Sequence, residues 1–457
     1  MNVVLLISDS LRADVISADT IGRPRTPFLD DLGTRMVHFR RAYATECWTL
    51  PAHASMFTGL LPSEHEAHFQ TMAYRKPHPT VAERLTEEGY YTELVTRCPI
   101  FDGTIPGITR GFQKLTRKLA APGPWNPAAL ALALTKPRLR RQIRETGFFH
   151  PDQVKNAAFV QEFARSLFPA DRLVLDHALE RMADLRREGR RYFLFCNLFD
   201  VHAPYCPVDD SLLAPVRSLG DLVESLTALD ALARVGRHQY LREGFRMGEP
   251  GRLALLRRYH RAVERMDAKL SRFYEQASSA GLLDDTLLVL ASDHGEAFGE
   301  HELYFHDASV YDVHLRVPLW VHHPEVSPAE VDDVVSMRWL GELMLSAATK
   351  RWPTDTLLDP SFRARHPVAL AEHFHYPHVP KMQPRYRRNL AAAISAEQKV
   401  IVRGEKNEHF DLRRDPDERT AEVAPLERFR GPRELAPLFA NAVEHLRGFR
   451  ARFGRAA

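Results

Sequence analysis

The chain has 457 residues, of which 44% are hydrophobic and 26% charged, with a formal net charge of +3. This length favours a main domain with a smaller one, and the near-neutral balance argues against a nucleic-acid partner. No apolar run reaches the ~18 residues of a membrane span. The chain starts without a basic signal region, and four cysteines make no disulfide framework, so we expect a cytoplasmic, reduced protein.

Three apolar runs, each typical of a buried parallel strand, end in an acid or in an acid closely followed by histidine. Residues 3–8 lead into Asp9, residues 192–199 into Asp200 and His202, and residues 287–292 into Asp293 and His294. Ligand sites in open α/β sheets lie just beyond the carboxyl ends of such strands. We therefore expect these distant residues to converge on one metal-sized spot.

Helix signals alternate with the strands. Residues 80–89 read as a helix with a threonine cap and a glycine stop, and a strand follows over 90–96. Helices over 171–187 and 259–278 lead into the second and third apolar runs. This alternation predicts an α/β protein with a mostly parallel sheet and helices on both faces.

Two stretches, at about 114–160 and 207–251, interrupt this rhythm and are expected to be insertions in a main domain that covers residues 1–365. From about residue 366 the pattern changes to short strands and a final helix over 433–452. We therefore predict a smaller C-terminal α+β subdomain over 366–457.

The segment that begins at Trp48 offers a hydroxyl at the start of a helix. Thr49 stands two residues before Pro51 and a run of small residues, which fits a helix N-cap. The same place lies in the positive potential of a helix N-terminus, which favours an alkoxide, and a neighbouring metal would lower the pKa of the hydroxyl further. The local sequence leaves both interpretations open.

Several motifs follow one another in a set order. They are Asp9-Ser10-Leu11-Arg12-Ala13-Asp14, Thr26-Pro27, Thr49-Leu50-Pro51 through Thr58-Gly59, Asp200-Val201-His202, Ser292-Asp293-His294-Gly295-Glu296 through His301, and Phe410-Asp411-Leu412. Together they resemble the sulfatase-like branch of the alkaline phosphatase superfamily. The resemblance implies an alkaline-phosphatase-like sheet for this chain.

The resemblance also implies a divalent metal site at Asp9, Thr49, Asp293 and His294, with Thr49 as the nucleophile. Two carboxylates, an imidazole and a hydroxyl form a mixed oxygen and nitrogen set. Such a set suits manganese or zinc, admits magnesium and fits calcium less well.

Three further positions receive roles from the same resemblance, and two more are placed by their proximity to the metal motif. His202 and His306 fall where the family contacts the transferred group or protonates the leaving oxygen. His53 stands where sulfatases usually have a substrate-binding arginine. Arg12 and His301 are expected next to the site, in support of the metal-binding residues.

Two positions depart from the sulfatase pattern. Sulfatases carry a cysteine or a serine at the nucleophile, which is converted to formylglycine, and threonine cannot be converted in that way. Ser10 stands where sulfatases usually supply a second aspartate. The remaining candidate ligands are two aspartates, a threonine and a histidine. This set resembles the single-metal site of the phosphoglycerol and phosphoethanolamine transferases, which are membrane-anchored.

We therefore expect a metal-dependent hydrolase of phosphoesters or related anionic esters that acts on a small molecule through a covalent intermediate on Thr49. The alternatives are a sulfuric ester hydrolase with an unmodified threonine, a phosphotransferase, and a catalytically silent relative that binds an anion or a partner protein. The sequence determines neither the alcohol part of the substrate nor the oligomeric state.

Some of the chemically reactive residues also have a structural interpretation. Asp200 fits a turn cap as well as it fits the site, and His301 fits a loop surface. Cys47 is expected to be a buried thiol that stands out of register with the nucleophile. A pocket rim or plain surface is favoured over a metal tract for the histidines His373, His375 and His378.

Overall fold

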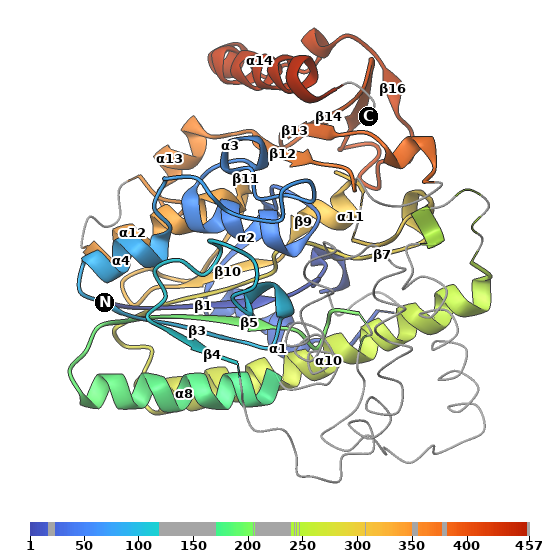
Figure 1. Cartoon of the computed structure of the whole chain (residues 1–457). Coiled ribbons are helices and arrows are strands. Elements are labelled where there is room, and N and C mark those ends of the chain that lie inside the picture. Colours follow the sequence, from blue (N-terminus) through green and yellow to red (C-terminus); the bar gives the residue numbers. More distant parts are fainter. Residues whose placement is uncertain are drawn as a thin grey trace.

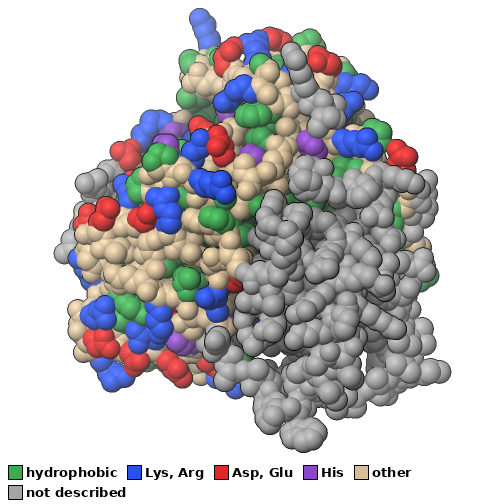
Figure 2. All heavy atoms as spheres, in the orientation of Figure 1, with side chains coloured by type: hydrophobic (Ala, Val, Ile, Leu, Met, Phe, Trp, Pro, Cys, Tyr) green, Lys and Arg blue, Asp and Glu red, His purple; other side chains and the backbone are tan. Residues whose placement is uncertain are grey.

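The computed structural model describes residues 1–16, 23–117, 171–203, 205, 239–241, 243, 245, 247–306, 308–349, 355–376 and 382–454. Most of the two predicted insertions, and His378, lie outside these residues. Within the described ranges, no helix has both the length and the apolar character that crossing a membrane requires. Figure 2 shows basic and acidic side chains interspersed over the described face in view, in keeping with the small net charge.

A nine-stranded, mostly parallel sheet forms the centre of the described fold (Figure 1). β1 runs parallel to both of its neighbours, β5 and β6, whereas β10 pairs antiparallel with β6 and β2. In spatial order the strands are β11 (Ala329–Ser336), β2 (Val37–Tyr43), β10 (Leu319–His322), β6 (Thr286–Ala291), β1 (Asn2–Ser8), β5 (Tyr192–Leu198), β3 (Tyr91–Thr96) and β4 (Lys114–Thr116), with β9 (Arg316–Val317) beside β2.

The central strands are apolar throughout because both faces of the sheet are covered. Along β1, Val3 and Leu5 belong to the core on one face, whereas Val4 and Leu6 belong to the core on the other. The first core includes α2 (Thr49–Thr58), α4 (Val81–Glu87) and α12 (Leu340–Thr349), and the second includes α1 (Pro27–Asp31), α8 (Asp171–Arg187) and α10 (Glu249–Ser279). The predicted fold class is confirmed.

Most predicted helix boundaries agree with the structure. Thr80 caps α4 and forms a capping box with Glu83, and Gly89 follows with a φ of +81°. The predicted start of the helix before the third strand is wrong, since α10 begins at Glu249 with a proline in its first turn. The extra turns bury Ala254 and Leu255 against the second core.

A five-stranded antiparallel sheet and a helix form the C-terminal part of the fold (Figure 1). Alternate residues of its strands face opposite sides: Ala392 and Ile401 join the core of the main sheet, whereas Ala393 and Val400 pack against the helix α14 (Ala436–Phe453). The strands are β12 (Ala369–His373), β13 (Leu390–Ile394), β14 (Gln398–Arg403), β15 (Lys406–Asp411) and β16 (Glu422–Val423).

Short elements connect these layers. They include α3 (Pro62–His65), α11 (Asp312–Leu315), α13 (Pro360–Arg365) and the two-stranded ribbon of β7 (Ala297–Phe298) and β8 (Tyr304–Phe305). The ribbon begins four residues after Asp293, and it leads the chain over the carboxyl end of the main sheet toward His306.

Candidate active site

The carboxyl ends of β1 and β6 bring three of the predicted ligands together. Ile7 pairs with Ala291 in the sheet, so Asp9 and Asp293 both leave from the same edge. Ligand atoms of Asp9, Asp293 and His294 lie within 4.8 Å of one another, and all three side chains are fully buried. This is the convergence that the strand-end argument predicts.

The carboxylate of Asp293 has one satisfied and one unsatisfied oxygen. Oδ1 accepts hydrogen bonds from the backbone nitrogens of Ser10 (3.2 Å) and His294 (3.0 Å). Oδ2 is buried without a hydrogen-bond partner in the described part of the chain. Burial and the charge of Asp9 raise the pKa of Asp293 well above its ordinary value. A cation bound at Oδ2 would remove this penalty.

The imidazole of His294 is oriented as a metal ligand. Its Nδ1 lies 3.0 Å from the carbonyl oxygen of Gly295, to which Nδ1–H donates, so Nε2 carries the lone pair. Nε2 lies 3.3 Å from Asp293 Oδ2 and 3.7 Å from Asp9 Oδ1. Burial, and then the neighbouring His306, lower the pKa of His294 well below its ordinary value. The ring is therefore neutral at pH 7 and can coordinate a cation.

Thr49 completes this group, and it does so from inside the helix. Trp48 occupies the N-cap of α2, and Thr49 is the first helical residue. The contacts described for the Thr49 hydroxyl are with Asp9 and His294, and neither is a backbone nitrogen of the helix. The cap interpretation is therefore wrong. The hydroxyl donates instead to Asp9 Oδ2 (3.4 Å) and lies 3.4 Å from His294 Nε2.

The donor set fits a divalent ion. Ligands of a tetrahedral ion at ~2.0–2.1 Å lie roughly 3.3 Å apart, and the spacings around His294 Nε2 are 3.3, 3.4 and 3.7 Å. The unsatisfied Asp293 Oδ2 and the lone pair of His294 both face this space. The mixed oxygen and nitrogen donors suit zinc, manganese or magnesium.

Ser10 holds the two carboxylates in place. Its backbone nitrogen donates to Asp293 Oδ1, and its hydroxyl donates to Asp9 Oδ1 at 3.1 Å. The residue has a φ of +65°, which non-glycine residues seldom adopt and which often marks a functional site. The residue that departs from the sulfatase pattern thus supports the two carboxylates of the candidate metal site.

His202 and His306 extend the group. The ring of His306 stacks on His294 with 4.5 Å between centroids, and the ring of His202 lies 4.9 Å from His306. His306 Nδ1 lies 3.3 Å from both carboxylate oxygens of Glu296, and His202 Nδ1 donates to the carbonyl oxygen of Ala203 at 2.8 Å. Both rings are therefore oriented through Nδ1.

His53 lies one helical turn after Thr49 and is fully buried. Its Nδ1 donates to the carbonyl oxygen of Thr49 at 2.8 Å and lies 3.6 Å from Asp293 Oδ2, while Nε2 has no hydrogen-bond partner among the described residues. Phe101 and Phe195 pack around the ring, and burial lowers the pKa of His53 to about 4. His53 is therefore neutral at pH 7 and does not supply the charge of an arginine.

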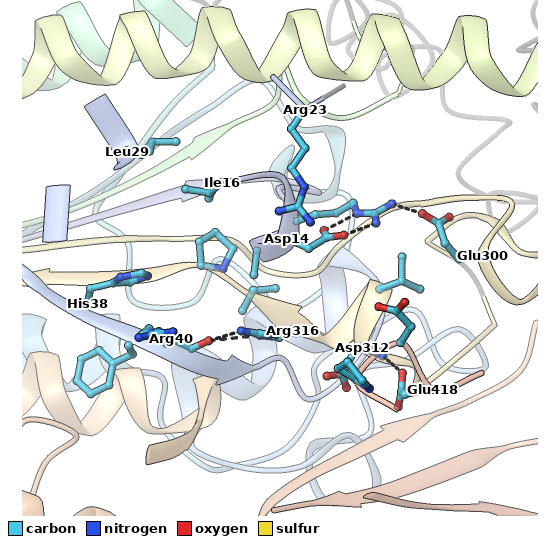
Figure 3. A pocket seen from close by; sticks show the side chains of 18 of the residues that line it. Asp14, Ile16, Arg23, Leu29, His38, Arg40, Glu300, Asp312, Arg316 and Glu418 are labelled. Atoms are coloured by element: carbon cyan, nitrogen blue, oxygen red, sulfur yellow. Dashed lines mark hydrogen bonds and ion pairs between the residues drawn. The ribbon is translucent and has the colours of Figure 1, made fainter. Parts of the chain in front are cut away.

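Arg12 and His301 line a separate cavity of about 1010 Å³ (Figure 3). Arg12 forms ion pairs with Asp14 and Glu300, both at 2.6 Å, and donates to the carbonyl oxygen of Glu296 at 3.0 Å. Arg12 therefore contacts the backbone of Glu296, the residue just before β7. The ring of His301 stacks on Tyr311 at 3.9 Å, and the described contacts do not bring it to the metal-binding group.

Other candidates have structural roles. Asp200 pairs with Lys269. The carboxylate that accepts the backbone nitrogens of Phe199 and Asp200, at 2.7 and 2.8 Å, is that of Asp171, so the described capping bonds of this turn do not come from Asp200. The surface interpretation is wrong for His373 and His375, which are both buried. His373 ends β12, which pairs with β13 and also contacts α3 and β11, and His375 lies two residues beyond that strand.

The sequence argument missed Glu296 and the supporting role of Ser10. Glu296 is fully buried and contacts His306, ten residues further on. Its place two residues after His294, in the same motif, was the available signal. No local pattern shows that the backbone of Ser10 turns toward Asp293, because that contact joins residues 283 positions apart.

Comparison with known proteins identifies the family. A model of the family described as Sulfatase matches residues 1–339, and the chain belongs to that family. Choline-sulfatase of Rhizobium meliloti (strain 1021) is 25% identical over 346 residues, covering 72% of this chain and 63% of the relative. The multifunctional alkaline phosphatase superfamily protein PehA of Trinickia caryophylli is 26% identical over 348 residues, covering 66% and 64%. The matches thus span less than two thirds of these relatives.

Solved structures confirm the alkaline-phosphatase-like fold. The phosphonate monoester hydrolase of Agrobacterium radiobacter superposes with a TM-score of 0.62 at 19% identity, over 99% of this chain and 95% of that one. BT4656, solved with its substrate D-glucosamine-2-N,6-O-disulfate, superposes with a TM-score of 0.65 at 14% identity, over 99% and 97%. Identities this low support the shared fold alone.

Proposed function

We propose that the chain is a metal-dependent hydrolase of phosphoesters or phosphonate esters, with Thr49 as the nucleophile. One observation carries the proposal: the Thr49 hydroxyl lies 3.4 Å from both Asp9 Oδ2 and His294 Nε2, inside the buried metal-binding group. The partners described for this hydroxyl do not include a backbone nitrogen of α2, so helix capping does not account for its position. A divalent ion held by Asp9, Asp293 and His294 would lower the pKa of the hydroxyl and neutralise substrate charge.

The side chains then divide the reaction between them. The Thr49 hydroxyl gives its proton to solvent water, its oxygen attacks phosphorus, a Thr49 Oγ–P bond forms, and the P–O bond to the leaving alcohol breaks. His306 or His202 gives that alcohol a proton. Glu296, within 3.3 Å of His306 Nδ1, orients the ring and stabilises its protonated form. Water then attacks phosphorus and the Thr49 Oγ–P bond breaks. The attacking water gives a proton back to the histidine, and the Thr49 oxygen takes up a proton from solvent.

A sulfuric ester hydrolase is the second candidate. The choline-sulfatase similarity favours it. Two replacements favour the phosphorus ester. A neutral, buried His53 stands in place of the usual arginine, and Ser10 stands in place of the second aspartate. A phosphotransferase would use the same first step and deliver the group to an acceptor alcohol in place of water.

Substitution of the nucleophile tests the proposal. We expect Thr49→Ser to retain substantial activity, because serine keeps the hydroxyl, and Thr49→Val to lose on the order of 10⁴-fold in kcat, because valine keeps the shape and removes it. Thr58→Val on the same helix is the matched control, since the Thr58 hydroxyl binds the Ala54 carbonyl oxygen. A Thr49→Val protein that turns over at near the wild-type rate would contradict the assignment.

The substrate class is tested side by side with aryl sulfate, phosphodiester, phosphomonoester and phenylphosphonate monoester substrates, each with manganese, zinc, magnesium and calcium. An acid quench during phenylphosphonate turnover should leave a phenylphosphonyl group on Thr49, which mass spectrometry distinguishes from a sulfate adduct. Hydrolysis of the sulfate ester alone would favour the second candidate. Metal binding with no turnover of any substrate would favour a silent anion-binding relative.

A further inference from the structure

A second cluster of metal-ligating side chains lies just before helix α2. Glu46 and Cys47 precede Thr49 in the chain, and His373 is the last residue of β12. One ligand atom from each lies within 4.8 Å of the other two, and the side chains are 0–1% exposed. The cluster shares no residue with the group around Asp9.

The spacing within this cluster fits a small ion. His373 Nδ1 lies 3.5 Å from Cys47 Sγ and 2.9 Å from Glu46 Oε1. A tetrahedral zinc with Zn–S of ~2.3 Å and Zn–N of ~2.0–2.1 Å separates sulfur and nitrogen by about 3.5 Å. The sulfur–nitrogen distance already has that value. Glu46 Oε1 now lies at hydrogen-bond distance from His373 Nδ1, and it would have to move away from that nitrogen by only a few tenths of an ångström.

The backbone around the cluster is fixed. Glu46 accepts hydrogen bonds from the backbone nitrogens of Cys47 at 2.8 Å and Phe374 at 3.3 Å, and the backbone nitrogen of Glu372 donates to the carbonyl oxygen of Thr45 at 2.8 Å. His373 Nε2 has no hydrogen-bond partner in the part of the chain described here. The orientation of the ring is therefore set by the contacts of Nδ1, the atom that faces Glu46 and Cys47.

We propose that Glu46, Cys47 and His373 form a binding site for a zinc-like divalent cation. One carboxylate and one thiolate balance the two positive charges, and the imidazole is neutral, so the occupied site carries no net charge, as full burial requires. Thiolate and imidazole ligands select zinc or cobalt over magnesium or calcium. The ion cross-links the segment before Thr49 to the C-terminal sheet, and it does so whether or not Thr49 is the nucleophile.

Cobalt titration of the metal-free full chain tests this site. A thiolate bound to Co²⁺ gives a near-ultraviolet charge-transfer band, which the oxygen and nitrogen ligands around Asp9 do not give. We expect wild type to bind two equivalents of Co²⁺ and to show the band. Asp293→Ala should lose one equivalent and keep the band, whereas Cys47→Ser should lose the band and the other equivalent.

Two other buried thiols serve as controls. Cys98 lies within electrostatic reach of Asp9 and Asp293, and Cys196 belongs to β5. We expect Cys98→Ala and Cys196→Ala to keep the band. A wild-type protein without the band, or a band that survives Cys47→Ser, would overturn the proposal. If Cys47→Ser does not fold, His373→Asn is used in its place, because the asparagine amide keeps a donor toward Glu46. The cobalt affinity of the His373→Asn protein at this site should fall at least about 10-fold.

Discussion

Burial and the neighbouring Asp9 disfavour a charge on Asp293 when no cation is bound. Its Oδ2 faces His294 without a hydrogen-bond partner in the described residues, and Asp9 repels it. The same arrangement would give a divalent ion its affinity at the proposed site, because a bound ion would remove the repulsion. Function and stability therefore oppose each other at this residue.

This opposition predicts a stabilised but metal-free variant. The folded-state pKa of Asp293 lies above its ordinary value of 3.8, so ionising Asp293 costs the metal-free protein stability as the pH rises above about 3.9. We expect metal-free Asp293→Asn to be more stable than metal-free wild type at pH 7, by roughly 1–2 kcal/mol, with a smaller difference near pH 4.

Thermal unfolding with and without metal checks this expectation. Added zinc or manganese should raise the Tm of wild type through binding to the folded state and leave the Tm of Asp293→Asn almost unchanged. Experiments on the Cys47→Ser background separate this effect from the second proposed site. An equal increase in the Tm of wild type and of Asp293→Asn on adding metal would mean that Asp293 is not a metal ligand.

Among the elements, β3 shows how a single buried carboxylate joins neighbouring segments. Glu93 is fully buried and contacts β4 through Lys114 and Thr116, and α8 through His177 and Arg181. Burial acts to raise the pKa of Glu93. The hydrogen bond from His177 and the contacts with Thr116 and Lys114 outweigh burial and hold the pKa at about 2.

The depressed pKa sets a pH range for this contribution. Glu93 stabilises the fold fully above its ordinary pKa of 4.5, and the stabilisation is lost as the pH falls toward about 2. We expect Glu93→Gln to lower the free energy of unfolding by roughly 1–3 kcal/mol at pH 7, and by progressively less below pH 4.5.

Urea denaturation across this pH range measures the difference. Glu342→Gln on α12 is a suitable control, because Glu342 is half exposed and its pair with Arg84 spans 3.5 Å. That change should cost less than about 0.5 kcal/mol. A penalty for Glu93→Gln that does not vary with pH would show that the ionised form carries no special stabilisation.

At the scale of the whole molecule, the C-terminal sheet is joined to the main domain by a buried cation. Lys399 on β14 is fully buried, and its Nζ lies 2.7 Å from Asp312 on α11 and 2.6 Å from Glu418. Burial lowers the pKa of Lys399, but the two carboxylates offset this and the pKa is raised. The ammonium therefore stays charged at pH 7.

Removal of this cation should destabilise the whole fold. Lys399→Met keeps the volume of the side chain and leaves two buried carboxylates without their partner, so we expect a loss of about 3–5 kcal/mol in chemical denaturation. The double variant Lys399→Met with Glu418→Gln should recover part of the lost stability, because one unpaired charge is gone. Arg413→Ala, at an exposed ion pair in the same subdomain, should change stability by less than about 0.5 kcal/mol. Equal effects at Lys399 and Arg413 would contradict this role.

The sequence by itself determined the sheet and the residues at its edge. Apolar runs before Asp9 and Asp293 predict buried parallel strands, because burial on both faces removes the alternation of polar side chains. Parallel strands end at a common edge, so the convergence of these acids follows from the pattern. The capping box at Thr80 likewise fixed the start of α4, since its bonds are local.

Only the tertiary structure decided how these groups face one another. The sequence left open whether the Thr49 hydroxyl caps α2, and the structure places it beside Asp9 and His294. The turn at Ser10 and the contact of His373 with Glu46 join residues about three hundred positions apart. Sequence patterns report local periodicity, whereas contacts between distant residues depend on how the layers pack, and packing is decided by the whole chain.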